Sequence, residues 1–183
     1  MDQKIKVAVI GTGALGKHHA RIYAEMADEG LIDCVGVYDQ NVAAAKEVAG
    51  KHRIPVLQSM EEATEKAHAL SIVTPTITHF TIANELLGKG KHLLVEKPMT
   101  DNTDQAQCLV ELAREKDCVL QIGHVERFNP VFTYLNASAT EPKFIETHRL
   151  SPYPARSTDI GVVLDLMIHD LDVVLAFVRS SVV

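Results

Sequence analysis

The chain has 183 residues, of which 46% are apolar and 23% are charged, a composition typical of a soluble globular protein with one full domain and part of another. Its net charge of −6 and its scattered basic residues argue against a nucleic-acid partner. No apolar run is long enough for a membrane span or a signal peptide, and the three cysteines have no metal-binding spacing. We therefore expect a cytoplasmic protein with reduced thiols, no metal and no membrane partner.

Apolar, β-branched segments alternate with helix-like segments as far as residue 124. The segments predicted to be strands are 4–11, 31–39, 54–56, 69–75, 91–98 and 118–124. The segments predicted to be helices are 14–27, 41–52, 59–67, 78–90 and 102–117. Ser59 and Glu62 have the spacing of a helix-capping box. Six strands separated by helices predict an α/β, Rossmann-type domain with a doubly wound parallel sheet.

The alternation stops after residue 124. The expected elements beyond it are a short helix at 126–138, a strand at 143–150, a loop at 151–161, an apolar helix at 162–178 and the start of a strand at 179–183. These elements are too few to enclose a core. The sequence thus predicts a nucleotide-binding domain over 1–123 and the incomplete start of an α+β substrate and oligomerisation domain over 124–183.

A glycine-rich turn follows the first predicted strand and opens a helix. Gly11, Gly13 and Gly16 have the G-x-G-x-x-G spacing, which allows a tight turn, close approach of a pyrophosphate and close helix packing. The helix N-terminus adds partial positive charge. A plain strand–turn–helix is the alternative. The cofactor-binding residues expected in this turn are Gly11, Thr12, Gly13, Ala14, Leu15 and Gly16.

Asp39 lies at the end of the second predicted strand, 23 residues after Gly16. A carboxylate at this place accepts hydrogen bonds from the adenosine ribose and repels a 2′-phosphate. Gln40 and Asn41 follow it, and neither is basic. The sequence therefore predicts NAD rather than NADP as cofactor, with an ordinary surface aspartate as the alternative.

Two later strand ends carry further candidates. Thr74, Pro75 and His79 follow the strand at 69–75, where ligands bind in such sheets, although turn and helix-capping roles explain these residue types equally well. Glu96 and Lys97 precede Pro98 at the end of the next strand, and these two residues, like the three before them, are candidate cofactor contacts. An ammonium there could hydrogen-bond a substrate hydroxyl and stabilise the developing oxyanion, whereas the alternative is a solvated lysine.

Polar residues interrupt the apolar helix predicted at 162–178. Asp165, His169 and Asp172 are spaced i, i+4 and i+7 and should share one helix face, while Asp170 points elsewhere and is expected to be structural. A histidine can accept a proton at neutral pH, and a carboxylate one turn away can orient it. The alternative is a satisfied polar seam on a packed helix.

Together these motifs resemble the glucose–fructose oxidoreductase/inositol dehydrogenase family from residue 4 to about 178. The resemblance rests on "GTGALGKHH", "VTPTITH", "EKPMT" and the D-x-x-x-H-D helix after "STDIGVVL". It implies a catalytic set of Lys97, Asp165 and His169, which would also contact the substrate, and a homo-oligomer for the full-length protein. The glycine-rich segment that usually precedes the aspartate helix is reduced here to Gly161.

The segment "QIGHVERFNP" is similar to that of family members that act on nucleotide sugars. In that case Arg127, Asn129 and Arg149 are candidate substrate contacts; a helix-capping turn with a surface arginine is the alternative. We expect NAD-dependent oxidation of a secondary hydroxyl of a sugar or nucleotide sugar. A dinucleotide-binding regulator without turnover and an NADP-dependent sugar reductase are the competing hypotheses.

Overall fold

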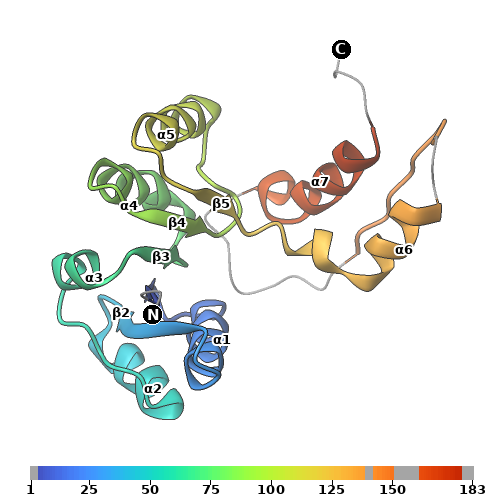
Figure 1. Ribbon diagram of the computed structural model, residues 1–183. Helices are drawn as coiled ribbons and strands as arrows, with labels where there is room; N and C mark the ends of the chain where they lie inside the picture. Colours follow the sequence, from blue (N-terminus) through green and yellow to red (C-terminus); the bar gives the residue numbers. More distant parts are fainter. Residues whose placement is uncertain (1–3, 139–141, 151–160, 179–183) are drawn as a thin grey trace. The chain divides into compact units, whose positions relative to one another are not determined.

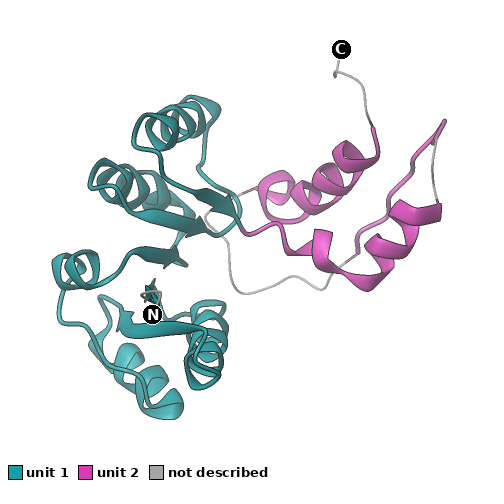
Figure 2. Ribbon diagram, in the orientation of Figure 1, with its two compact units in different colours: residues 1–122 teal, residues 123–183 magenta. Residues whose placement is uncertain are grey.

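The computed structural model describes residues 4–138, 142–150 and 161–178. The chain forms two compact units, Met1–Ile122 and Gly123–Val183 (Figure 2). The boundary lies one residue from the one expected from the sequence. Among the described residues, no helix is both long and apolar enough to cross a membrane.

The first unit is a parallel sheet with helices on both faces (Figure 1). Its strands are β1 (Ile5–Ile10), β2 (Ile32–Tyr38), β3 (Ala69–Ile72), β4 (His92–Val95) and β5 (Leu120–Ile122). Its helices are α1 (Gly16–Asp28), α2 (Val42–His52), α3 (Met60–Lys66), α4 (Thr76–Gly88) and α5 (Thr103–Glu115). The strand order is β2-β1-β3-β4-β5, and every pairing is parallel. The predicted α/β fold is confirmed.

The segment 54–56 does not form the full strand that the sequence predicted. Only Val56 pairs, through an isolated parallel bridge to Val37 on the outer side of β2. The Val37 N–H donates to the Pro55 carbonyl at 3.0 Å, and the Leu57 N–H donates to the Val37 carbonyl at 2.8 Å. Pro55 has no N–H with which to extend the ladder. Counting this bridge as the outermost element, the sheet has the 3-2-1-4-5-6 order of dinucleotide-binding folds.

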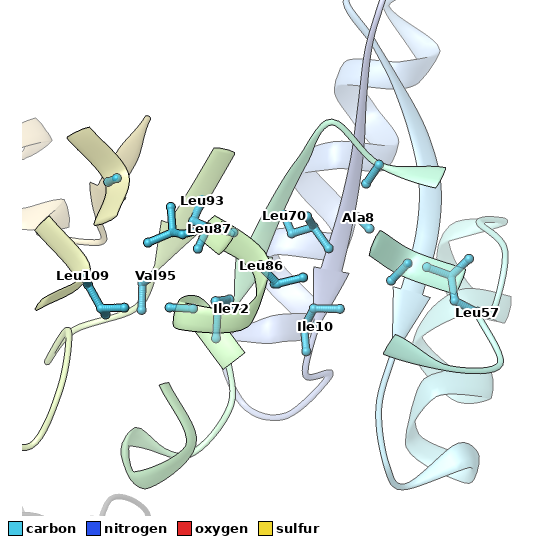
Figure 3. Packing of buried hydrophobic residues seen from close by; sticks show 14 residues of the cluster. Ala8, Ile10, Leu57, Leu70, Ile72, Leu86, Leu87, Leu93, Val95 and Leu109 are labelled. Atoms are coloured by element: carbon cyan, nitrogen blue, oxygen red, sulfur yellow. The ribbon is translucent and has the colours of Figure 1, made fainter. Parts of the chain in front are cut away.

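Side chains alternate along β1, so its two faces pack against different helices. Ala8 and Ile10 belong to the larger core cluster, which contains residues of α3, α4 and α5 and is drawn in Figure 3. Val9 belongs to the smaller cluster with Ala20 of α1 and Ala49 of α2. This division is the physical basis of the doubly wound arrangement.

Side-chain caps define where several helices begin. Ser59 accepts a hydrogen bond from the Glu62 N–H at 3.1 Å, as the predicted capping box requires. The Glu62 carboxylate in turn accepts from the Gln58 N–H at 2.6 Å, one residue earlier than the Ser59 N–H expected in a capping box. Asn41 and Asn102 cap α2 and α5 in the same way. These caps satisfy backbone donors that a helix leaves open at its start.

The second unit is helical in its described part. Its elements are the 3₁₀ helix η1 (Val125–Phe128), α6 (Pro130–Ser138), the π-helix η2 (Val163–Met167) and α7 (Ile168–Phe177). The strand predicted at 143–150 is wrong, because this segment has no strand conformation. A polar–apolar alternation makes a strand only where a neighbouring strand supplies hydrogen bonds, and the described part of this unit supplies none. Most of the predicted loop at 151–161 and the predicted strand at 179–183 lie outside the described residues.

Candidate functional site

The glycine turn lies where the sheet order reverses, between the carboxyl ends of β1 and β3. Gly11 has φ +94°, and a Cβ on it would collide with the Val73 carbonyl oxygen just after β3. A Cβ on Gly16 would collide with the Gly11 carbonyl oxygen. Both positions therefore require glycine, and the turn is held tightly against the end of β3.

The same turn leaves room for a ligand at Gly13. Apart from Gly13 itself and its two chain neighbours, no heavy atom of the described residues lies within 4 Å of the place where a Gly13 Cβ would stand. No described side chain caps the N-terminus of α1, and its first turn contains no acidic residue. Thr12 is buried, whereas Gly13, Ala14 and Leu15 are exposed. Open space beside uncapped helix N–H groups fits a dinucleotide pyrophosphate.

Asp39 is hydrogen-bonded to Thr12 of the glycine turn. Its Oδ2 accepts hydrogen bonds from the Thr12 backbone N–H at 2.7 Å and from the Thr12 hydroxyl at 2.9 Å. Its Oδ1 accepts from the Asn41 N–H at 2.8 Å. The carboxylate is thus fixed beside the turn at the end of β2, where a ribose binds in folds of this kind.

His79 is buried, with only 1% of its surface exposed. Its Nδ1 lies 2.9 Å from the Pro98 carbonyl oxygen, and its Nε2 lies 2.9 Å from the Thr74 carbonyl oxygen. The ring therefore links the turn at Thr74 and Pro75 to the segment after Lys97, a role that the sequence did not reveal. Cofactor contact by Thr74, Pro75 and His79 stays a prediction.

Glu96 and Lys97 follow β4 at the same edge of the sheet as the glycine turn, because all the strands are parallel. Glu96 is buried, and its Oε1 lies 2.9 Å from His19 Nε2. Burial raises the pKa of the Glu96 carboxyl, but the hydrogen bond and charge of His19 and the Lys97 backbone N–H together bring that pKa below its ordinary value. Glu96 is therefore a carboxylate at neutral pH.

His19 is a site residue that sequence reasoning missed. Its Nδ1 lies 3.3 Å from the Ser71 hydroxyl, which lies 2.7 Å from the Tyr23 hydroxyl. Burial raises the pKa of Tyr23, partly offset by the Ser71 hydrogen bond, so the phenol stays protonated. The spacing of His19 and Tyr23 one helical turn apart on α1 was the available signal, but it does not reveal which strand they face.

The helix of the second unit that carries Asp165 and His169 is not uniformly α-helical. Asp165 lies in the π-helix η2, whose turns are wider than those of an α-helix, and His169 lies at the start of α7. The prediction of a common face assumed a regular α-helix and so omitted this change of period. Lys97 belongs to the first unit, and its convergence with Asp165 and His169 on one substrate stays a prediction.

Arg127 makes a two-pronged ion pair within the second unit. Its Nε and Nη2 lie 2.8 and 2.7 Å from the carboxylate oxygens of Asp172. The Arg127 hydrogen bonds outweigh burial and, with His124, bring the pKa of Asp172 below its ordinary value. Asp172 thereby ties α7 to η1, and His169 is among the charges that lower its pKa; the face that it was expected to share with Asp165 and His169 stays a prediction.

Arg149 and Asn129, the other predicted substrate contacts, also have partners in this unit. Arg149 Nη2 lies 3.0 Å from Asp170, and its Nη1 lies 3.3 Å from Glu126. The Asn129 side-chain oxygen accepts from the Val131 N–H at 3.0 Å and so caps α6. These contacts agree with the structural role expected for Asp170, and substrate binding by the two residues stays a prediction. No described group of three or more His, Cys, Asp or Glu residues is arranged to hold a metal.

A family model described as "Oxidoreductase family, NAD-binding Rossmann fold" matches residues 5–124. The chain belongs to this family. Within it, the chain is 42% identical over 172 residues to UDP-N-acetylglucosamine 3-dehydrogenase of Acidithiobacillus ferrooxidans, a match that covers 93% of this chain and 53% of that protein. A solved structure of that dehydrogenase superposes with a TM-score of 0.89 at 40% identity, over 99% of this chain and 59% of the other.

More distant relatives match over similar lengths. The scyllo-inositol 2-dehydrogenase (NAD(+)) of Bacillus subtilis is 26% identical over 94% of this chain and 54% of its own. The structure of GenD2 from gentamicin A biosynthesis, solved in complex with NAD, has a TM-score of 0.81 at 23% identity over 97% of this chain and 54% of that chain, and supports the fold alone. The chain spans about half the length of these relatives.

Proposed function

We propose that the protein is an NAD-dependent dehydrogenase that oxidises a secondary hydroxyl of a sugar or nucleotide sugar. The observation that carries the proposal is the sharing of one sheet edge by the glycine turn after β1 and the Glu96–Lys97 pair after β4. A nucleotide-binding turn and a cation at the same edge are the parts that a hydride-transfer site requires.

NAD is favoured over NADP by the position of Asp39. Its carboxylate is bonded to Thr12 and Asn41, so a 2′-phosphate on the adenosine ribose would meet a fixed negative charge. No arginine follows Asp39 to neutralise such a phosphate, since the next two residues are Gln40 and Asn41. When bound, NAD supplies the hydride acceptor of the reaction.

The residues of this chain have distinct roles in the proposed reaction. The ammonium of Lys97 donates to the reacting hydroxyl oxygen and stabilises its developing negative charge. The imidazole of His169 removes the hydroxyl proton, and the Asp165 carboxylate holds that imidazole in the required tautomer. Arg127, Asn129 and Arg149 contact the remainder of the substrate, and two arginines suit a nucleotide diphosphate.

The relatives support the substrate class that we propose. The relative at 42% identity is a UDP-N-acetylglucosamine 3-dehydrogenase, so UDP-N-acetylglucosamine is the first substrate to test. The decisive experiment is a screen of the full-length gene product for NADH formation with UDP-sugars, inositols and free hexoses. Formation of NADH with one of these classes supports the proposal. NAD binding without turnover of any of them favours the regulator, and turnover with NADP alone favours the reductase.

Replacement of Lys97 by Ala tests the catalytic assignment. Turnover should fall by orders of magnitude, since one donor to a developing oxyanion contributes about 10²–10³-fold. NAD binding should stay within a few-fold of that of the wild type. Lys89→Ala, which removes an exposed lysine paired with Glu85 at the end of α4, is the matched control and should keep full activity. Wild-type turnover by Lys97→Ala would rule out the role given to this lysine.

A further inference from the structure

Lys97 lies between two residues that are each bonded to a histidine. On its N-terminal side, Glu96 Oε1 is 2.9 Å from His19 Nε2. On its C-terminal side, the Pro98 carbonyl oxygen is 2.9 Å from His79 Nδ1. Glu96 is 8% exposed and His79 1% exposed, so water competes little for either bond.

The direction of both hydrogen bonds follows from the acceptors. A carboxylate and a carbonyl have no proton to give, so His19 donates from Nε2 to Glu96, and His79 is the donor in each of its contacts, from Nδ1 to Pro98 and from Nε2 to Thr74. The neutral His79 ring has a single N–H and donates to one of these two carbonyls at a time, whereas the imidazolium donates to both. The start of the segment 96–98 is also tied to β3, because the Glu96 N–H donates to the Ile72 carbonyl at 3.0 Å.

A second set of bonds fixes the ring of His19. When the His19 ring is neutral with its proton on Nε2, it accepts at Nδ1 from the Ser71 hydroxyl at 3.3 Å, and Ser71 accepts from the Tyr23 hydroxyl at 2.7 Å. The hydrogen bonds of this row then all run in one direction, with Tyr23 donating to Ser71, Ser71 to His19 and His19 to Glu96. Ser71 has 0% exposure, so the row stands on a rigid part of β3.

The two histidines come from the helices that follow the proposed cofactor turns. His19 is on the first full turn of α1, after the glycine turn, and His79 is on the first turn of α4, after Thr74 and Pro75. His79 Nε2 also lies 2.9 Å from the Thr74 carbonyl oxygen. The helices α1 and α4, which follow the turns proposed to contact NAD, are thus each joined to the segment that bears Lys97 by the side chain of one histidine.

We propose that His19 and His79 are positioning residues that fix the backbone on either side of Lys97 and so aim its ammonium at the reacting hydroxyl. The inference rests on the proposed function, because it takes Lys97 to contact the substrate. Catalysis depends steeply on such aim, and a misplacement of about 1 Å can lower the rate about 100-fold.

The test compares His19→Ala with His19→Gln, and His79→Ala with His79→Gln, in the full-length gene product. Glutamine keeps an N–H donor, so each glutamine variant should recover much of the activity that its alanine partner loses. We expect kcat to fall about 10- to 100-fold in the alanine variants while NAD affinity changes only about two- to threefold. His18→Ala, which removes an exposed neighbour on the same helix, is the matched control and should behave as wild type.

Two NMR measurements on the wild-type and variant proteins need no substrate. In His19→Ala the pKa of the Glu96 carboxyl should rise, since burial remains and the partner that lowers it is gone. The Lys97 amide should exchange with solvent faster in both alanine variants. If the two histidines had only a structural role, the alanine variants would lose thermal stability but keep the kcat and the Lys97 amide exchange of wild type. There would then be no lost activity for the glutamine variants to recover.

The outcomes separate this inference from the proposed function. A wild-type protein that oxidises no sugar with NAD defeats the proposed function. The two NMR measurements then still test whether His19 and His79 anchor the backbone on either side of Lys97. An active wild type whose alanine variants keep its kcat and its Lys97 amide exchange overturns the anchoring and leaves the dehydrogenase intact. If an alanine variant does not fold, its glutamine partner is judged by the same two readouts against wild type.

Discussion

At the scale of single residues, the hydrogen bonds of Thr12 to Asp39 join the glycine turn to the end of β2, 27 residues later in the chain. The Thr12 side chain and N–H are buried, and Asp39 accepts from both. The aspartate therefore has two functions in our proposal. It holds the glycine turn closed, and it presents its charge to the ribose.

Replacement of Asp39 by Ala should weaken NAD binding and reduce the preference for NAD over NADP. A hydrogen bond to a charged group is worth about 1.5–3 kcal/mol, which corresponds to about a tenfold or greater loss of affinity. NADP should lose less, because a repulsive charge disappears with the ribose contact. The chain has no tryptophan, so the fluorescence of NADH and NADPH themselves is a convenient readout.

Asp33→Ala is the control for this experiment. Asp33 is exposed on the same strand, β2, so its removal should leave both affinities unchanged. An Asp39→Ala protein with the cofactor preference of wild type would show that the carboxylate does not contact the ribose.

At the scale of elements, the cap at Ser59 could be predicted from the sequence, whereas the number of residues per helical turn around Asp165 could not. Ser59 was predicted as a cap from its spacing to Glu62, because a cap depends on neighbours in the chain. The π-turn around Asp165 depends on packing as well as on local sequence, so the spacing of Asp165, His169 and Asp172 could not reveal it. Short-range chemistry is easier to read than a change of helical period.

The N-cap of α5 offers a test of stability. Asn102 Oδ1 accepts from the Gln105 N–H at 3.0 Å, so Asn102→Ala leaves that donor without its partner. We expect a loss of about 1 kcal/mol in the free energy of unfolding, measured by urea denaturation. Gln107→Ala on the exposed side of the same helix should change stability by less than about 0.5 kcal/mol. Equal losses in the two variants would contradict the capping role.

At the scale of the whole chain, the alternation of strands and helices was sufficient to predict the first unit. Buried parallel strands are continuous apolar runs, and their order follows from the handedness and shortness of the connections. The sequence could not show that 54–56 pairs at a single residue, since this depends on how Pro55 faces Val37. It also could not show which polar residues meet across the sheet, as His19, Ser71 and Glu96 do.

Glu96, the carboxylate in the polar row with His19, should make the free energy of unfolding depend on pH. Because the folded-state pKa of Glu96 is lowered, its ionised form stabilises the fold at and above the ordinary glutamate pKa. That contribution is lost as the pH falls from the ordinary value through the lowered one. Glu96→Gln should therefore be less stable than wild type at neutral pH, and the difference should shrink over this acidic range.

Urea unfolding at several pH values measures this difference. Glu47→Gln, at an exposed position of α2, serves as the control and should show no comparable pH-dependent difference from wild type. A constant gap between Glu96→Gln and wild type across the acidic range would mean that the titration of Glu96 is not coupled to folding.

The way the sheet ends has a consequence for association between molecules. An open strand edge exposes a row of unpaired N–H and C=O groups on which another chain can build. Here one margin is the three-residue strand β5, and the other is closed by the single bridge at Val56 beside a proline. A second copy of the protein finds little template for growing this sheet outward, which guards the fold against edge-to-edge aggregation.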